Sequence, residues 1–228
     1  HTKVKFVIVS WRNLPSVSIN DPLLMLGKPA PLTAATGMDA LTHAVEAYIS
    51  KDANPVTDAA AIQAIRLIAR NLRQAVALGS NLQARENMAY ASLLAGMAFN
   101  NANLGYVHAM AHQLGGLYDM PHGVANAVLL PHVARYNLIA NPEKFADIAE
   151  FMGENIHGLS TMDAAESAIC AITRLSSDIG IPQHLSELGV KEADFPYMAE
   201  MALKDGNAFS NPRKGNEKEI VAIFRQAF

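Results

Sequence analysis

From about residue 31 onward, signals that start and stop α-helices recur along nearly the whole chain. Asn54-Pro55 places a capping side chain before a proline at the first helical position, and Asn141-Pro142 repeats the pair. Ser160, with Asp163 three residues later, predicts another helix start. After Asn54, apolar residues recur every three or four positions, the spacing of one helix face: Ile62, Ile65, Ala69, Leu72 and Val76. We therefore expect an all-α region of about eight to ten helices with short loops.

Further helices are expected on the same grounds. They cover about 84–101, the segment from Tyr106 to Tyr118, the segment from the Pro121–Gly123 turn to about Ile139, and the regions near 192–204 and 217–227. Gly79 is expected to end the helix that Asn54 begins.

The first thirty residues have a different character. Phe6-Val7-Ile8-Val9 is β-branched and aromatic, which predicts a buried strand, and four Pro and Gly residues between positions 15 and 29 predict an irregular connection. No clear partner strand follows, and the first residue is His1 rather than Met. Both features predict that the chain begins partway through a larger protein.

Composition narrows the possible partners. Eighteen Lys and Arg residues against 21 Asp and Glu residues give a net charge of −3, and no segment gathers the basic residues, so a nucleic-acid partner is not expected. No window reaches the ~18 consecutive apolar residues of a membrane-spanning helix. The single cysteine, Cys170, excludes an intramolecular disulfide and fits a reducing cytoplasm. Its apolar neighbours predict a buried thiol.

Histidine placement carries most of the chemical information. Asp39 and His43 are four residues apart, which puts both side chains on one helix face about one turn apart. Taken alone, the pair is explained equally well by an intrahelical hydrogen bond. His108 and His112 repeat the spacing among apolar neighbours, and His122 follows at a Pro–Gly turn. Each of these three, taken singly, could be a core histidine with a hydrogen-bond partner.

The combination favours a metal site. Three imidazoles and one carboxylate suit a borderline divalent ion such as Fe(II) or Zn(II). Four protein ligands on a six-coordinate ion leave positions open for a substrate oxygen, whereas structural zinc sites are closed and usually rich in cysteine. The metalloprotease helix has a Glu after its first histidine, but here that position is Ala109, so hydrolysis by that mechanism has no base.

Two long segments carry a family resemblance. Residues 31–46, PLTAATGMDALTHAVE, and residues 105–126, which contain GYVHAMAHQLGG and PHGVAN, resemble the two signatures of the iron-containing (group III) alcohol dehydrogenases, which have the dehydroquinate-synthase-like fold. Asn211-Pro212-Arg213 near the end of the chain is also similar to this family. The resemblance implies a multi-helix metal-binding catalytic domain over residues 31–228. Residues 1–30 are then the last strand and connection of an N-terminal dinucleotide-binding domain.

The resemblance also implies roles for individual residues. Asp39, His43, His108 and His122 correspond to the ligands of Fe(II), with Zn(II) possible in its place. His112 corresponds to a histidine that lies near the nicotinamide, and we expect it to carry a proton to solvent. Positions that contact NAD(P) correspond to Lys5, Leu24, Met25, Leu26, Gly27 and Lys28. The implied activity is metal-assisted hydride transfer between a primary alcohol and a nicotinamide dinucleotide, in a cytoplasmic homodimer.

Two other functions are consistent with the same residues. The chain could be a non-catalytic helical metal-binding or interaction module, or part of a zinc-dependent polyol dehydrogenase of the same fold. The sequence contains no G-x-G-x-x-G loop for a pyrophosphate. We therefore expect this chain to be an incomplete portion of the enzyme, without turnover of its own.

Overall fold

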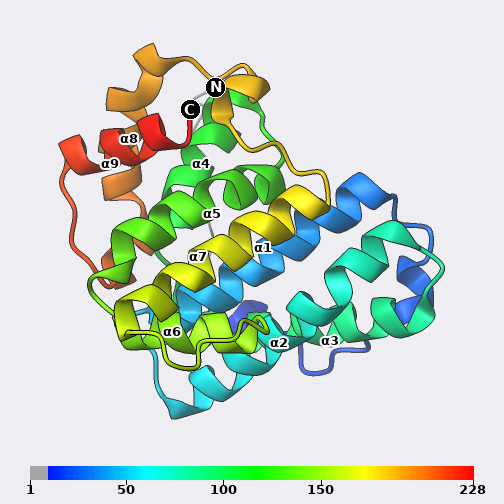
Figure 1. Ribbon diagram of the computed structural model, residues 1–228. Helices are drawn as coiled ribbons and strands as arrows, with labels where there is room; N and C mark the ends of the chain where they lie inside the picture. The colour runs from blue at the N-terminus through cyan, green and yellow to red at the C-terminus, as the bar shows by residue number, and fades with distance from the viewer. Residues whose placement is uncertain (1–9) are drawn as a thin grey trace.

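A computed structural model describes residues 10–228, and every regular element in that range is a helix (Figure 1). The strand expected at Phe6–Val9, and Lys5, lie outside the described residues. The α-helices are α1 Ala30–Ile49, α2 Pro55–Ala77, α3 Leu82–Ala102, α4 Tyr106–Tyr118, α5 His122–Leu138, α6 Pro142–Phe151, α7 Thr161–Asp178, α8 Phe195–Lys204 and α9 Glu217–Gln226. Short 3₁₀ turns join some of them, including Pro22–Met25 before α1 and Gly206–Ser210 after α8. The all-α prediction is confirmed for this part of the chain.

Helix α1 is the central element of the bundle. It packs against α2, α3, α5 and α6, and it is buried along most of its length. In Figure 1 it runs through the middle of the molecule, and α2 and α3, which pack along it, lie below it in the view. Helix α4 packs against α5 and α8, which brings the second half of the chain onto the same core. Polar side chains on α1 therefore lie at least partly among other helices: Glu46 is buried, and Asp39 and His43 are half-buried.

Two of the predicted helix starts are confirmed and one is wrong in its detail. The Asn54 side chain accepts hydrogen bonds from the N–H groups of Val56 and Thr57, and Ser160 accepts one from Asp163. Asn141 does stand at the start of α6, but its side chain caps nothing there. Its amide group instead donates to the carbonyl oxygen of Ile49, 3.1 Å away, at the end of α1. A long-range partner has replaced the local one.

The buried face of α2 is turned slightly from the predicted face. Ile65 and Leu72 are fully buried as expected, but Ala61, Ile68 and Ala75 complete the innermost row. The other three predicted residues, Ile62, Ala69 and Val76, are only half-buried.

The prediction for Cys170 is wrong, because its side chain is exposed. Ile169 and Ile172 mark the inner face of α7, and the intervening position 170 points outward. No helix in residues 10–228 has both the length and the apolar character needed to cross a membrane.

Candidate metal centre

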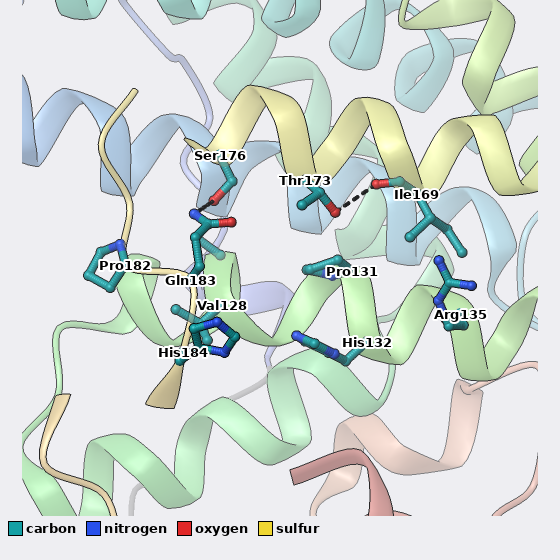
Figure 2. A pocket seen from close by; sticks show the side chains of 11 residues that line it. Val128, Pro131, His132, Arg135, Ile169, Thr173, Ser176, Pro182, Gln183 and His184 are labelled. Carbon is teal, nitrogen blue, oxygen red and sulfur yellow. Dashed lines mark hydrogen bonds between the residues drawn. The ribbon is translucent and has the colours of Figure 1, made fainter. Parts of the chain in front are cut away.

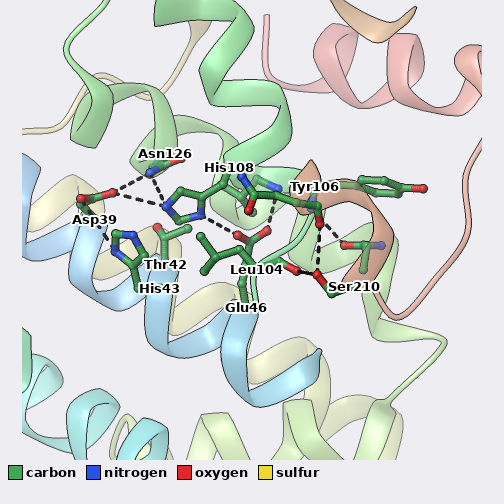
Figure 3. A network of polar contacts seen from close by, with 12 residues as sticks. Asp39, Thr42, His43, Glu46, Leu104, Tyr106, His108, Asn126 and Ser210 are labelled. Atoms are coloured by element: carbon green, nitrogen blue, oxygen red, sulfur yellow. Dashed lines mark hydrogen bonds and ion pairs between the residues drawn. The ribbon is translucent and has the colours of Figure 1, made fainter. Parts of the chain in front are cut away.

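Three helices bring the predicted metal ligands together, and Figure 3 shows three of them, Asp39, His43 and His108. Asp39 and His43 lie one turn apart on α1, His108 lies in the first turn of α4, and His122 is the first residue of α5. Asp39 Oδ1 is 3.8 Å from His108 Nε2 and 3.6 Å from His122 Nε2, and Asp39 Oδ2 is 3.8 Å from His43 Nδ1. One carboxylate thus lies within reach of all three imidazoles.

The spacing of the donor atoms fits one shared ion. Ligand atoms of Asp39, His43 and His108 all lie within 4.8 Å of one another. Two ligands bound at about 2.0–2.2 Å from one ion are separated by no more than about twice that length. The His43 and His108 rings are 4.3 Å apart between centroids, and those of His108 and His122 are 5.3 Å apart. Asp39, His43 and His108 could therefore hold one divalent cation, and His122, whose Nε2 is 3.6 Å from Asp39 Oδ1, is the candidate fourth ligand.

A buried carboxylate orients His108. Glu46 Oε2 lies 2.6 Å from His108 Nδ1, and Glu46 Oε1 accepts the backbone N–H of Val107 at 2.7 Å. In its ionised form the Glu46 carboxylate only accepts hydrogen bonds, so in that form it favours the proton on Nδ1 and leaves the Nε2 lone pair directed at Asp39 and the other ligands. Burial raises the pKa of Glu46 to about 7, although backbone N–H groups of residues 105–108 offset part of the rise. This is the carboxylate–histidine pairing typical of metal sites.

An asparagine amide marks the point at which the donor atoms converge. Asn126 Nδ2 lies 2.5 Å from Asp39 Oδ1 and 3.1 Å from the Nε2 atoms of both His108 and His122. The amide nitrogen has two hydrogens to donate, so it can satisfy two of these three atoms at a time, and all three lie around one place. Asn126 is fully buried, and its Oδ1 accepts no hydrogen bond within residues 10–228. A cluster of acceptors around a single point is the chemistry that a cation requires.

His43 has the protonation state that a ligand needs. Burial, and then the neighbouring His108, lower the pKa of His43 to about 4, against the opposing effect of Asp39. The ring is therefore neutral at pH 7 and has a lone pair available. It also stacks on Phe99 of α3, with 4.5 Å between ring centroids, which limits its rotation.

Close backbone approach sets the distance between α1 and α5. A Cβ atom placed on Gly123 would lie 2.3 Å from the carbonyl oxygen of Ala35, well inside contact distance. Only glycine therefore allows the start of α5 to approach α1 this closely. Because His122 is adjacent to Gly123, the same approach brings its ring to Asp39.

His112 lies beside the ligand histidines. Its ring is 5.6 Å from that of His122 between centroids and nearly parallel to it, at 22°. Its side chain is buried, and its Nδ1 lies 2.7 Å from Asp205 Oδ2. The structure thus places His112 next to the candidate metal centre, and its expected position near the nicotinamide stays a prediction.

The stretch Leu24–Lys28 lies against the first half of α1. Lys28 Nζ donates to Thr36 Oγ1 at 2.5 Å, about one turn before Asp39. Leu24 is 84% exposed and Leu26 37% exposed, so their apolar side chains are open to a ligand or another protein surface. Burial, and then the charge of Arg85, lower the pKa of Lys28. The stretch is therefore close to the metal centre, and contact with a dinucleotide stays a prediction.

Arg85 fixes this stretch in place. Its guanidinium group is buried, and it donates to the carbonyl oxygens of Gly79 and Lys28 and to Thr33 Oγ1, at 2.7–2.9 Å. It forms no ion pair with a carboxylate in the described part of the chain. Three neutral acceptors thus satisfy a buried cation and tie α3 to the start of α1.

A second polar region lies away from the metal centre. A cavity of about 270 Å³ lies between α5, α7 and the loop at 182–184 (Figure 2). His132, Arg135, Gln183 and His184 line it, and Figure 2 shows His132 on α5 and His184 on the loop that borders the cavity. Burial, with smaller effects of His184 and Arg135, lowers the pKa of His132 to about 4, so its ring is neutral at pH 7.

Sequence analysis assigned no role to Glu46, Arg85, Asn126 or Asp205. Two of these carry a local signal: Glu46 follows His43 by three residues and Asn126 follows His122 by four, which places each on the helix face of a predicted ligand. Asn126 contacts that same ligand, whereas Glu46 contacts His108 of α4. Arg85 and Asp205 meet their partners only through tertiary packing, so no local pattern predicts their contacts.

The chain belongs to the Fe-containing alcohol dehydrogenase family: the model of its C-terminal region matches residues 33–228. It is 95% identical over 227 residues to a 1,3-propanediol dehydrogenase of Citrobacter freundii, and 52% identical over 225 residues to an NAD-dependent methanol dehydrogenase of Bacillus methanolicus. The whole chain aligns with the first of these but spans only 59% of its length.

Solved structures agree with this assignment. A crystal structure of a 1,3-propanediol oxidoreductase has 93% sequence identity and a TM-score of 0.96 over 96% of this chain, and 57% of that protein is covered. An alcohol dehydrogenase from Oenococcus oeni has 64% identity and a TM-score of 0.95. The arrangement of the helices is therefore that of the C-terminal half of this family.

Proposed function

We propose that this chain is the metal-binding half of an enzyme that interconverts a primary alcohol and an aldehyde with a nicotinamide dinucleotide. The observation that carries the proposal is the convergence of Asp39, His43, His108 and His122 on one point. Residues 31–228 supply this centre, and residues 1–30 belong to the cofactor-binding half. The relatives' names make 1,3-propanediol the first substrate to test and NAD the first cofactor.

The donor set suits Fe(II), with Zn(II) as the alternative. A divalent ion bound there supplies Lewis-acid chemistry, which polarises an alcohol or carbonyl oxygen and favours loss of the alcohol proton. The dinucleotide accepts or returns the hydride, and the protein's part is position and electrostatics.

The chain's own residues prepare the site for this reaction. Glu46 holds His108 with its Nε2 lone pair facing the centre, and His43 stays neutral at pH 7. His112, next to His122 but outside the ligand set, is the group that receives the alcohol proton and passes it to solvent. Leu24–Lys28, held by Arg85 beside the same end of α1, contacts the dinucleotide.

The test is to replace His108 with Ala in the enzyme that contains this chain. The variant is expected to lose its bound metal and at least about 100-fold of its NAD-linked oxidation of 1,3-propanediol. His157→Ala, which changes an exposed loop histidine, is the matched control and is expected to keep both. Full activity in a metal-free His108→Ala enzyme would eliminate the proposal.

A fluorescence titration with NADH separates this function from a non-catalytic metal-binding module. The enzyme is expected to change the emission of the reduced nicotinamide on binding, and a metal-binding module leaves it unchanged. Iron and zinc are distinguished by loading the metal-depleted enzyme with each ion in turn and comparing turnover of the diol.

A further inference from the structure

Asp205 makes a contact that the proposed function does not use. It follows α8 directly, and its Oδ2 lies 2.7 Å from His112 Nδ1, although the two residues are 93 positions apart. Its other oxygen, Oδ1, accepts the backbone N–H of Asn207 at 2.9 Å. Both side chains are shielded from water, with 4% of His112 and 13% of Asp205 exposed. The carboxylate is therefore held on one side by backbone and directed at the imidazole on the other.

This contact fixes the form of the imidazole. An ionised carboxylate accepts hydrogen bonds and donates none, so Nδ1 of His112 carries the hydrogen. In the neutral ring, Nε2 is then the atom with the free lone pair. The Nε2 edge of the ring is the edge that Asp205 does not engage, and the ring lies 5.6 Å from that of His122 and 6.4 Å from that of His108.

We propose that Asp205 is a positioning residue for the alcohol–aldehyde reaction, holding His112 in the form that can take up the substrate's proton. This inference rests on the proposed function. In the oxidation direction the alcohol O–H bond breaks and its proton goes to His112 Nε2, while the C–H bond breaks and its electron pair leaves as hydride to the oxidised nicotinamide. The products are an aldehyde, the reduced nicotinamide and His112 protonated on both nitrogens. Asp205 stabilises that cation until the proton leaves for solvent.

The position of Asp205 also has a purely structural interpretation. Its hydrogen bond joins the turn after α8 to α4, so its loss could simply loosen that packing. A test must therefore read out the state of His112 and not only the activity. Asp147 provides a matched control, because it accepts a hydrogen bond of similar length, 2.8 Å, from Tyr48 between α6 and α1.

The first measurement is the tautomer of His112 in the Zn(II)-loaded enzyme, read from side-chain ¹⁵N shifts after histidine labelling. His112→Gln identifies the signal by its disappearance. The wild-type ring is expected to carry hydrogen on Nδ1, and Asp205→Asn is expected to shift it toward the Nε2–H form, because the amide group can also donate. A His112 ring with hydrogen on Nε2 in the wild type would overturn the inference.

The second measurement is steady-state kinetics. Asp205→Asn is expected to lower kcat by about 100-fold with KM for the diol nearly unchanged, while Asp147→Asn keeps kcat within about twofold. Adding Asp205→Asn to His112→Ala is expected to cause no further loss, because Asp205 acts through that ring. An equal loss in both backgrounds would show a structural role and contradict the inference.

Two further outcomes distinguish failure of the proposed function from failure of the inference about Asp205. If His112→Ala retains full kcat, the proton role of His112 in the proposed function is wrong, whereas the tautomer measurement still tests its contact with Asp205. If Asp205→Asn does not fold, Asp205→Glu keeps a carboxylate and is expected to retain the Nδ1–H form with most of the kcat. Loss of the Nδ1–H form in a folded Asp205→Glu enzyme would count against the inference.

Discussion

Glu46 contacts a candidate metal ligand without belonging to the proposed ligand set. Its Oε2 faces His108 Nδ1 at 2.6 Å in the interior of the protein. Glu46→Gln keeps the shape of the side chain, but its amide group has only one oxygen. In one orientation the NH₂ group faces Nδ1–H of His108, and in the other it faces the N–H of Val107. In the first case two donors face each other, and His108 relieves the conflict by moving its hydrogen to Nε2, which is the metal-binding atom.

We expect Glu46→Gln to weaken metal binding by about 10- to 100-fold. The measurement is a titration of metal-depleted enzyme with Zn(II) in competition with a chromogenic chelator. Glu200→Gln is the control, because it removes the same charge from an exposed ion pair with Lys204 and is expected to leave affinity within about twofold. Equal affinities of all three proteins would show that Glu46 does not orient His108.

His132 gives a prediction about pH that is independent of the metal centre. Its pKa is about 4 in the folded protein against 6.5 for the free side chain, so the unfolded chain binds more protons between these values. The resulting stability is fully present above pH 6.5 and is lost as the pH falls toward 4. His132→Gln is therefore expected to show a shallower rise in unfolding free energy across this range.

Urea unfolding of the two proteins between pH 4.5 and 7 measures this difference. His157→Gln, at an exposed turn, is the control and is expected to follow the wild-type curve. If the unfolding free energy of His132→Gln rose with pH as steeply as that of the wild type, burial of His132 would have no effect on its protonation.

At the scale of the helices, the separation of α1 and α5 determines whether His122 reaches Asp39. Gly123→Ala would push a methyl group against the Ala35 carbonyl, and backbone must move to relieve the overlap. We expect a loss of about 1–3 kcal/mol in unfolding free energy together with weaker metal binding. Gly96→Ala in α3 is the matched control, because open space surrounds that position, and we expect it to be neutral or to stabilise by up to about 1 kcal/mol.

Chelator titration and thermal unfolding of both glycine variants provide the measurements. If Gly123→Ala bound metal as tightly as Gly96→Ala, the close approach of α5 to α1 would not be what positions His122.

The helices themselves were largely predictable, because the signals that start and stop them are local. The caps at Asn54 and Ser160 form as the sequence predicts, since donor and acceptor are at most three residues apart. The exact buried face of α2, the outward orientation of Cys170 and the bond from Asn141 to Ile49 depend on neighbouring helices. Those features come from packing, which spacing along one helix does not encode.

At the scale of the whole molecule, the candidate site joins residues spread over 84 positions, from Asp39 to His122, through the packing of α1, α4 and α5. Their combination of residue types already favoured a metal site, but the assignment of these four as the ligands came from the family resemblance, because spacing alone left each histidine open to a simpler explanation. Glu46, Asn126 and Asp205 add the hydrogen bonds that orient this set. The fold thus supplies a partly buried, pre-oriented donor cluster that no single segment contains.

The most direct test of this arrangement is anomalous X-ray diffraction from crystals of the enzyme loaded anaerobically with Fe(II) and measured at the iron absorption edge. We expect one strong peak at about 2.0–2.2 Å from ligand atoms of Asp39, His43, His108 and His122. A fully loaded crystal whose only peak lies elsewhere, or in which fewer than three of these side chains contact the ion, would contradict the proposed metal centre.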